Sequence, residues 1–107
     1  MVKIEHYQHE DGGIPYQAWF IKLRDVVAKV AVSKRIDRLA LGNFGNCRDV
    51  GNGVSELKID VGPGYRVYVA HRGERLVILL CGGNKSTQPK DIELARKYWT
   101  DWKRRQK

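Results

Sequence analysis

The sequence predicts an α+β domain, in which two N-terminal helices pack on a small antiparallel sheet and a further helix ends the chain. Apolar residues recur at three- and four-residue spacing over Pro15–Gly42, which indicates helix. Three short apolar or alternating stretches follow, separated by glycine-containing turns, before a second helical pattern begins. Because 107 residues suffice for one hydrophobic core and not for two, we expect a single domain over residues 1–107.

The N-terminal third predicts one strand and two helices. Residues 2–6 alternate apolar and polar side chains, as a short strand does, and a polar stretch with two glycines follows. Pro15 suits the first turn of a helix, and Gly42 suits the left-handed exit from one. Since the segment between them is long for one globular helix, we expect a break near Arg24–Val27.

The middle of the chain predicts a loop and then a three-stranded meander. Glycine and asparagine dominate residues 42–53, which is typical of a loop, and a short strand could lie within it. Consecutive antiparallel pairing is expected for the three strands that follow, and the last should be central because its side chains are almost all apolar. These strands are Val54–Asp60, Tyr65–Ala70 and Arg75–Cys81.

The C-terminal part predicts a helix. Gly82-Gly83 would mark the exit from the third strand, and Ser86-Thr87-Gln88 before Pro89 can cap a helix. The apolar residues beyond it, among them Trp99 and Trp102, fall roughly on one helical face, and packing is their simplest role.

The charge of the chain favours a polyanionic partner. Twenty Lys and Arg oppose twelve Asp and Glu, a formal net charge of +8. The basic excess is largest in residues 95–107 and is repeated in residues 14–42. The sequence has no apolar run long enough to span a bilayer and does not begin like a signal peptide, so we expect a cytoplasmic protein without a membrane partner. Cys47 and Cys81 lack CxxC spacing, which favours two reduced thiols.

Three sequence motifs carry a resemblance to a known family. They are GVSELKI at residues 53–59, GPGYRVY at residues 62–68 and GGNKSTQ at residues 82–88. Together they resemble the RelE/ParE toxin superfamily, and more narrowly its RelE/HigB-type addiction module killer protein branch. The resemblance implies a fold of the microbial ribonuclease type and the role of toxin in a type II toxin–antitoxin pair. Members near RelE cleave messenger RNA in the ribosomal decoding site, whereas ParE relatives poison DNA gyrase.

Metal-free RNA cleavage needs a base for the 2′-hydroxyl, a cation for the phosphate and an acid for the leaving 5′-oxygen. The resemblance places catalytic residues at Glu56, Arg66 and Lys85, of which Lys85 could stabilise the phosphate or assist the leaving group. It implies RNA contacts from Lys58, Tyr65, Arg66 and Lys85, and neither a metal nor a cofactor. Those relatives often end in a catalytic His or Tyr, which residues 103–107 lack, so the general acid is unassigned.

Simpler interpretations exist for several of these residues. Charged side chains that alternate along a strand, such as Glu56 and Lys58, are commonly only solvated. Tyr65 and Tyr68 fall on different faces of their strand, so one is expected in the core, while the other could stack on bases. His6 and His9 lack a matching third ligand for zinc.

These observations give one leading hypothesis and two rivals. The leading hypothesis is a toxin that cleaves messenger RNA on the ribosome and is neutralised by a cognate antitoxin, expected to be a small helix-turn-helix protein. The rivals are a non-nuclease gyrase poison and a binding-only co-repressor, and operator DNA would be contacted only through the antitoxin. A basic surface suits each, because attraction to phosphates does not depend on sequence.

Overall fold

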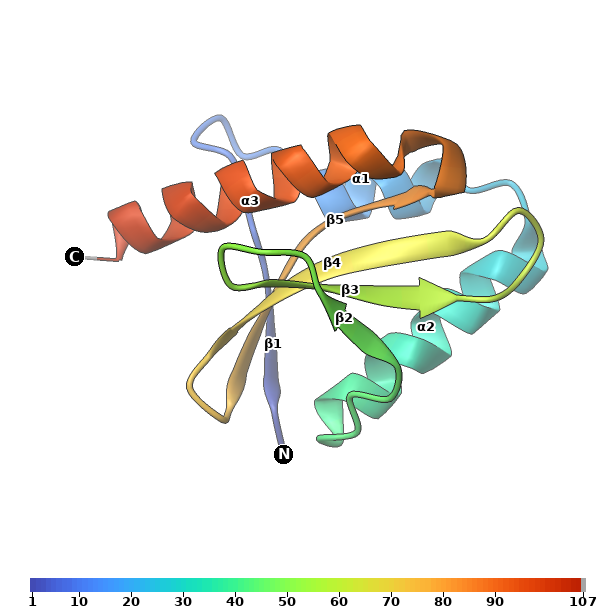
Figure 1. Ribbon diagram of the computed structural model, residues 1–107, viewed down its shortest axis with the longest axis horizontal. Helices are drawn as coiled ribbons and strands as arrows, with labels where there is room; N and C mark the ends of the chain where they lie inside the picture. The colour runs from blue at the N-terminus through green and yellow to red at the C-terminus, as the bar shows by residue number, and fades with distance from the viewer. Residues whose placement is uncertain (107) are drawn as a thin grey trace.

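Five strands form one sheet in the order β1-β5-β4-β3-β2. The computed structural model describes residues 1–106 and shows helices on both faces of this sheet (Figure 1). The three strands predicted after residue 53 are present, and β4 pairs antiparallel with both β3 and β5. The strands are β1 (Lys3–His6), β2 (Cys47–Asp49), β3 (Val54–Ile59), β4 (Tyr65–Arg72) and β5 (Leu76–Asn84).

The sheet is mixed, so the prediction of a purely antiparallel sheet is wrong. β1 lies parallel to β5, with Lys3 opposite Leu76 and His6 opposite Leu79. The chain leaves β1 through two helices and returns to its side only after β2, β3 and β4 have formed. This long crossover allows parallel pairing, which a tight turn cannot provide. The short strand β2 lies inside the predicted loop and pairs antiparallel with β3 at the other edge.

Helices α1 (Pro15–Lys22) and α2 (Val26–Ala40) cover one face of the sheet. The chain breaks between them, within the predicted interval, because the Asp25 side chain accepts a hydrogen bond from the Ala28 amide and starts a new helix. Nine buried side chains form the core under the two helices: Tyr16, Val32, Leu39, Leu57, Ile59, Val67, Val69, Val77 and Leu79.

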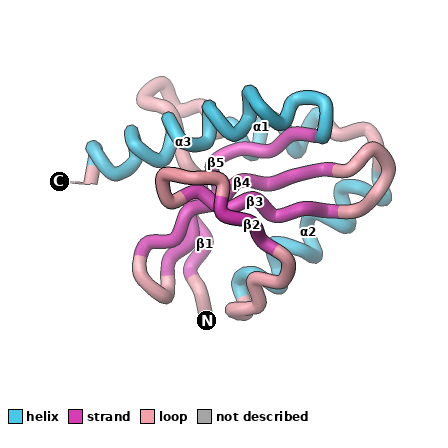
Figure 2. Tube along the Cα trace, in the orientation of Figure 1, coloured by secondary structure: helices cyan, strands magenta, loops and turns pink. Residues whose placement is uncertain are grey.

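Helix α3 (Gln88–Arg105) covers the opposite face (Figure 2). A short 3-10 helix, η1 (Lys85–Thr87), precedes it, and Asn84 caps that turn by accepting from the Ser86 and Thr87 amides. The second core contains Trp99 and Trp102 of α3, together with Tyr68 of β4 and Leu80 of β5. No helix within residues 1–106 is long and apolar enough to span a membrane.

Gly82 and Gly83 lie inside β5, so their interpretation as a strand exit is wrong. A side chain at Gly82 would overlap the Trp19 ring, and one at Gly83 would overlap the Asp91 carboxylate. The two glycines therefore let helices on both faces approach the sheet closely.

Candidate functional site

Polar side chains gather in a hollow of about 500 Å³ on the α3 side of the sheet, beside β2 and β3 and near the start of α3. The strand registers explain the gathering, because Arg48 lies opposite Glu56 and Lys58 lies opposite Arg66. Residues directly opposite each other in a sheet project to the same face. The lining residues are Asn46, Cys47, Arg48, Glu56, Lys58, Arg66 and Gln88.

Glu56 is the centre of this cluster and is buried, with 5% of its surface exposed. Its Oε2 atom accepts hydrogen bonds from the Tyr68 hydroxyl at 3.1 Å and the Gln88 amide at 2.8 Å. Its Oε1 atom lies 3.3 Å from a guanidinium nitrogen of Arg48, whose side chain is 64% exposed. Because each carboxylate oxygen has two lone pairs, Oε2 is fully occupied, while Oε1 keeps one acceptor site that no group in residues 1–106 fills.

Arg66 is buried to the same degree and has donors without partners. Its Nε atom lies 3.7 Å from Oε2 of Glu56, which is an ion pair but too long for a hydrogen bond. Neither Nε nor NH1 has a hydrogen-bond partner in the part of the chain that the structure describes. Unpaired buried donors on a charged group are costly, so an added acceptor such as an anion would relieve that cost.

Tyr68 fixes the position of Glu56. Its side chain is completely buried, and burial, together with the charge of Glu56, raises its pKa well above the ordinary range. The hydroxyl therefore stays protonated and donates to Glu56 rather than acting as an acid itself.

Sequence reasoning missed Arg48, Tyr68 and Gln88 as parts of this cluster. Tyr68 lies two residues after Arg66, so strand alternation placed both on one face and could have indicated the contact. Arg48 and Gln88 reach the cluster from a strand hidden in a loop and from the start of a helix.

The structure brings together some of the predicted site residues and not others. Lys58 lines the hollow, half exposed, and also lies 3.5 Å from Asp60. Lys85 is exposed at the same end of the sheet, where its amide donates to the Gly64 carbonyl, but it does not line the hollow. Tyr65 belongs to the core on the opposite face, where its ring centroid is 6.5 Å from that of Trp19.

Several other side chains that could carry chemistry lie outside the hollow. Tyr98 of α3 stacks on Tyr7 with ring centroids 4.7 Å apart. Within residues 1–106, no three His, Cys, Asp or Glu side chains come close enough together to hold a metal ion. The two histidines considered for zinc separate, because the ring of His6 packs on Tyr16 and that of His9 on Tyr7 and Tyr98. Cys47 and Cys81 are both free thiols.

Comparison with known proteins places the chain in a family. Residues 19–100 match the family described as "Phage derived protein Gp49-like (DUF891)". The chain belongs to this family. The Gp49-like family is of the RelE/ParE-like toxin type, which confirms the resemblance at that level, whereas the RelE/HigB branch stays a prediction. The matched range contains Glu56, Arg66 and Lys85.

A bacterial relative shares most of this sequence. A protein of Haemophilus influenzae (strain ATCC 51907 / DSM 11121 / KW20 / Rd), described as "Uncharacterized protein", is 49% identical over 83 residues. The alignment covers 78% of this chain and 84% of the relative.

Proposed function

We propose that this Gp49-like protein is the toxin of a type II toxin–antitoxin pair and that it cleaves messenger RNA on the ribosome without a metal. The observation that carries the proposal is the buried Glu56–Arg66 ion pair, in which Nε and NH1 of Arg66 have no hydrogen-bond partner within residues 1–106. Membership of a toxin-type family and a net charge of +8 support it.

Arg66 is the proposed phosphate ligand. A guanidinium group presents donors in a planar fork that matches two phosphate oxygens, and it stays charged at all physiological pH values. The neighbouring carboxylate fixes the orientation of the fork before substrate arrives, so little reorganisation is needed when charge develops in the transition state.

Glu56 is the proposed base, acting through Oε1. That oxygen has a free acceptor site, and its present partner, Arg48, is exposed enough to move toward a substrate phosphate. Glu56 would take the 2′-hydroxyl proton as the 2′-oxygen attacks phosphorus. The bond from phosphorus to the 5′-oxygen breaks, leaving a 2′,3′-cyclic phosphate and a 5′-hydroxyl.

Lys58 is the proposed source of the proton for the leaving 5′-oxygen. It lies directly opposite Arg66 in the sheet and lines the same hollow. Its half-exposed amine can regain a proton from solvent after each turnover, while Glu56 loses the one it gained. Lys85, outside the hollow, is proposed as an RNA contact at the edge of the site, and Tyr65 remains an RNA-contact prediction that its position does not favour.

The proposed cellular setting follows from this activity. The toxin would act in the cytoplasm, where translating ribosomes are found, and would be held inactive by a cognate antitoxin that covers the hollow. An acidic antitoxin segment would suit a surface of this charge, and operator DNA would be reached only through the antitoxin.

Induced expression with mapping of messenger RNA ends tests the proposal. Wild-type protein should arrest growth and leave cuts with 5′-hydroxyl ends inside translated frames. Arg66→Ala should lower the cleavage rate by about 100-fold to 1,000-fold, the effect of removing one preorganised transition-state donor. Arg24→Ala, which removes an exposed arginine between α1 and α2, is the matched control and should cleave normally.

The rival functions give different results in the same experiment. A gyrase poison would produce double-strand DNA breaks and leave messenger RNA intact. A binding-only co-repressor would arrest neither growth nor translation. Equal cleavage by wild type and a folded Arg66→Ala variant would remove Arg66 from the mechanism.

A further inference from the structure

A second buried arginine, Arg35 of α2, also lacks a full set of partners. Only 4% of its surface is exposed. Its NH2 atom donates to the backbone carbonyls of Phe44 and Asn46, the latter at 2.9 Å, and its NH1 atom has no partner within residues 1–106. No carboxylate in that part of the chain forms an ion pair with it.

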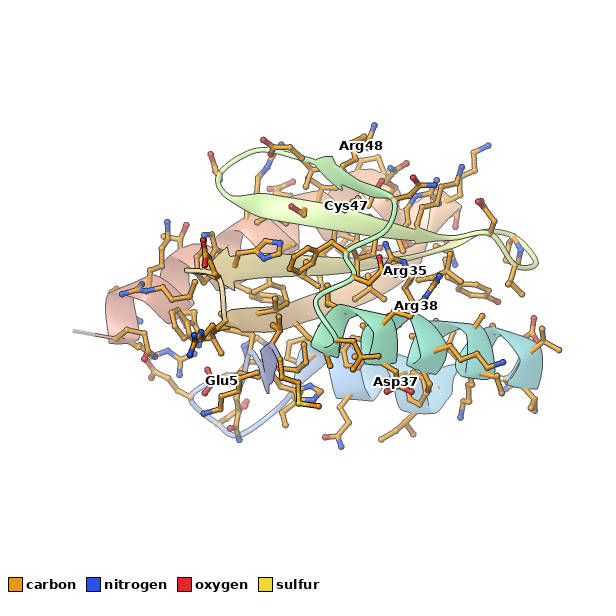
Figure 3. The ribbon with its side chains drawn as sticks, turned by 90° about the horizontal axis from the view of Figure 1, so that it is seen from below. Glu5, Arg35, Asp37, Arg38, Cys47 and Arg48 are labelled. Carbon is orange, nitrogen blue, oxygen red and sulfur yellow. The ribbon has the colours of Figure 1, made fainter. Side chains whose placement is uncertain are left out.

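Arg35 lines a groove of about 750 Å³ between α2 and β3. Lys34 and Arg38 of α2, both exposed, lie along the same groove. Figure 3 shows Arg35 and Arg38 on the side of α2 that faces the sheet. The groove thus has a buried guanidinium at its floor and exposed cations at its rim.

The balance of charge in the groove is positive. Lys58 is the fourth cation, and the two lining carboxylates, those of Asp37 and Asp60, do not cancel the four. Asp60 is already paired with Lys58. Asp37 also lines a separate hollow on the α1 side of α2, and Figure 3 shows it on the side away from the sheet. Burial, followed by the charge of Arg38, lowers the pKa of Arg35 below its ordinary value, as expected where cations outnumber anions.

The groove and the hollow around Arg66 meet at one edge of the sheet, although they lie on its opposite faces. Asn46 and Lys58 line both spaces, and Lys58 lies just beyond the residues of β3 that pair with β2. A strand of RNA with one phosphate at Arg66 could therefore continue past Lys58 toward Arg35. A phosphate backbone fits better than an isolated anion, because the cations are spread along a path rather than gathered at one point.

We propose that the Arg35 groove binds the sugar–phosphate backbone of the RNA on one side of the phosphate held at Arg66. Lys34 and Arg38 contact phosphates directly, and Arg35 supplies a poorly screened positive charge beneath them. The proposal extends the proposed function, since it makes the groove part of the same RNA-binding surface.

Binding of a non-cleavable RNA tests the groove separately from catalysis. The probe is a fluorescein-labelled 2′-O-methyl RNA octamer, measured by anisotropy over a range of salt concentrations, with a 2′-O-methyl dinucleotide as the short counterpart. Lys34→Gln/Arg38→Gln should weaken octamer binding by about tenfold and lower the slope of log affinity against log salt by about 1.4, the loss of two single-strand phosphate contacts. Dinucleotide binding should not change.

Lys22→Gln/Lys97→Gln is the matched control, because it removes the same charge from two exposed lysines that line neither the groove nor the hollow. It should retain octamer affinity within about twofold. Both double variants alter exposed side chains and should fold, whereas Arg35→Met also removes the contacts that hold the loop at Phe44 and Asn46.

Three outcomes would overturn the proposal. They are equal losses in the groove and control variants, full octamer affinity in the groove variant, and loss of binding to a deca-glutamate peptide while octamer binding is kept. The last outcome would assign the groove to an acidic protein segment instead. If the groove variant loses octamer affinity but Arg66→Ala still cleaves normally, the proposed catalytic role fails while the groove assignment stands.

Discussion

Arg66 and Arg35 are buried to nearly the same degree, yet the two guanidinium groups have different partners. Arg66 lies beside a buried carboxylate, that of Glu56, which is held in turn by Tyr68 and Gln88. Within residues 1–106, Arg35 has only backbone carbonyls as hydrogen-bond partners, and the charge of Arg38 acts against its own. One positive charge is neutralised within the fold, and the other is not.

The difference indicates two ways to recognise a phosphate. In the hollow around Arg66, the carboxylate cancels much of the charge, so donor geometry is what the site offers to a ligand. In the groove around Arg35, the uncompensated charge attracts anions over a longer distance and with less demand for geometry. A site for chemistry needs the first property, and a surface that guides a polymer needs the second.

The largest expected effect is on stability and compares the two arginines directly. Glu56→Gln should lower the free energy of unfolding by about 3–5 kcal/mol, because it leaves the buried guanidinium of Arg66 without its counter-ion. Arg35→Met should cost less, about 1–3 kcal/mol, since the lost hydrogen bonds are partly offset by removal of an unpaired buried charge.

Urea unfolding of both variants measures this difference. Glu56→Gln/Arg66→Met should recover part of the loss, because the double variant no longer buries an unpaired charge. If Arg35→Met lowers the free energy of unfolding more than Glu56→Gln does, the proposed difference between the two buried arginines is wrong.

A smaller effect on thermal stability should distinguish Gly42 from Gly45. Both lie in the loop after α2, whose Phe44 and Asn46 carbonyls accept hydrogen bonds from Arg35. Gly42 and Gly45 both have positive φ, at 89° and 56°, so alanine at either position costs about 1 kcal/mol in backbone strain. At Gly45 the added Cβ would also lie 3.0 Å from the Arg35 guanidinium, whereas at Gly42 nothing lies within 4 Å. Gly45→Ala should therefore lower Tm more than Gly42→Ala.

Thermal unfolding in the Arg35→Met background provides the control for this prediction. In that background the difference in Tm between Gly45→Ala and Gly42→Ala should be smaller, because the guanidinium that the alanine Cβ at position 45 would contact is absent. An unchanged gap would show that Arg35 does not determine the cost at Gly45.

The smallest expected effect depends on pH and acts through His71. Its ring packs edge-on against Phe44, whose carbonyl accepts from Arg35. Burial lowers the pKa of His71 below its ordinary value of about 6.5. The His71 ring therefore binds a proton less readily in the folded protein than in the unfolded chain. Stability should therefore be highest above pH 6.5 and should fall as the pH drops below it.

His71→Gln should make the dependence of Tm on pH shallower between pH 7.5 and pH 5.5. His6→Gln and His9→Gln, which lie outside this contact, serve as controls for general histidine titration. Identical pH profiles for wild type and His71→Gln would exclude His71 as the group that titrates.

Much of the local structure could be predicted from the sequence, because it depends on neighbours along the chain. Pro15 begins α1, the α1–α2 break falls within the predicted interval, and the alternation after residue 53 gives β3 and β4. The same alternation placed Glu56 and Lys58 on one face of their strand, and the register of the folded sheet adds Arg66 opposite Lys58. Each of these features follows from backbone preference or side-chain periodicity, which act over a few residues.

The tertiary structure decided which charges are buried and what they meet. By sequence alone, Glu56 on a polar strand face resembles a solvated residue, but α3 brings Gln88 over it and β2 brings Arg48 beside it. Periodicity could not predict the parallel pairing of β1 with β5, because such pairing depends on the path of the whole chain. Nor could it distinguish Arg35 from its exposed neighbours Lys34 and Arg38. Burial and charge compensation depend on contacts between segments far apart in sequence, and only the folded chain brings those segments together.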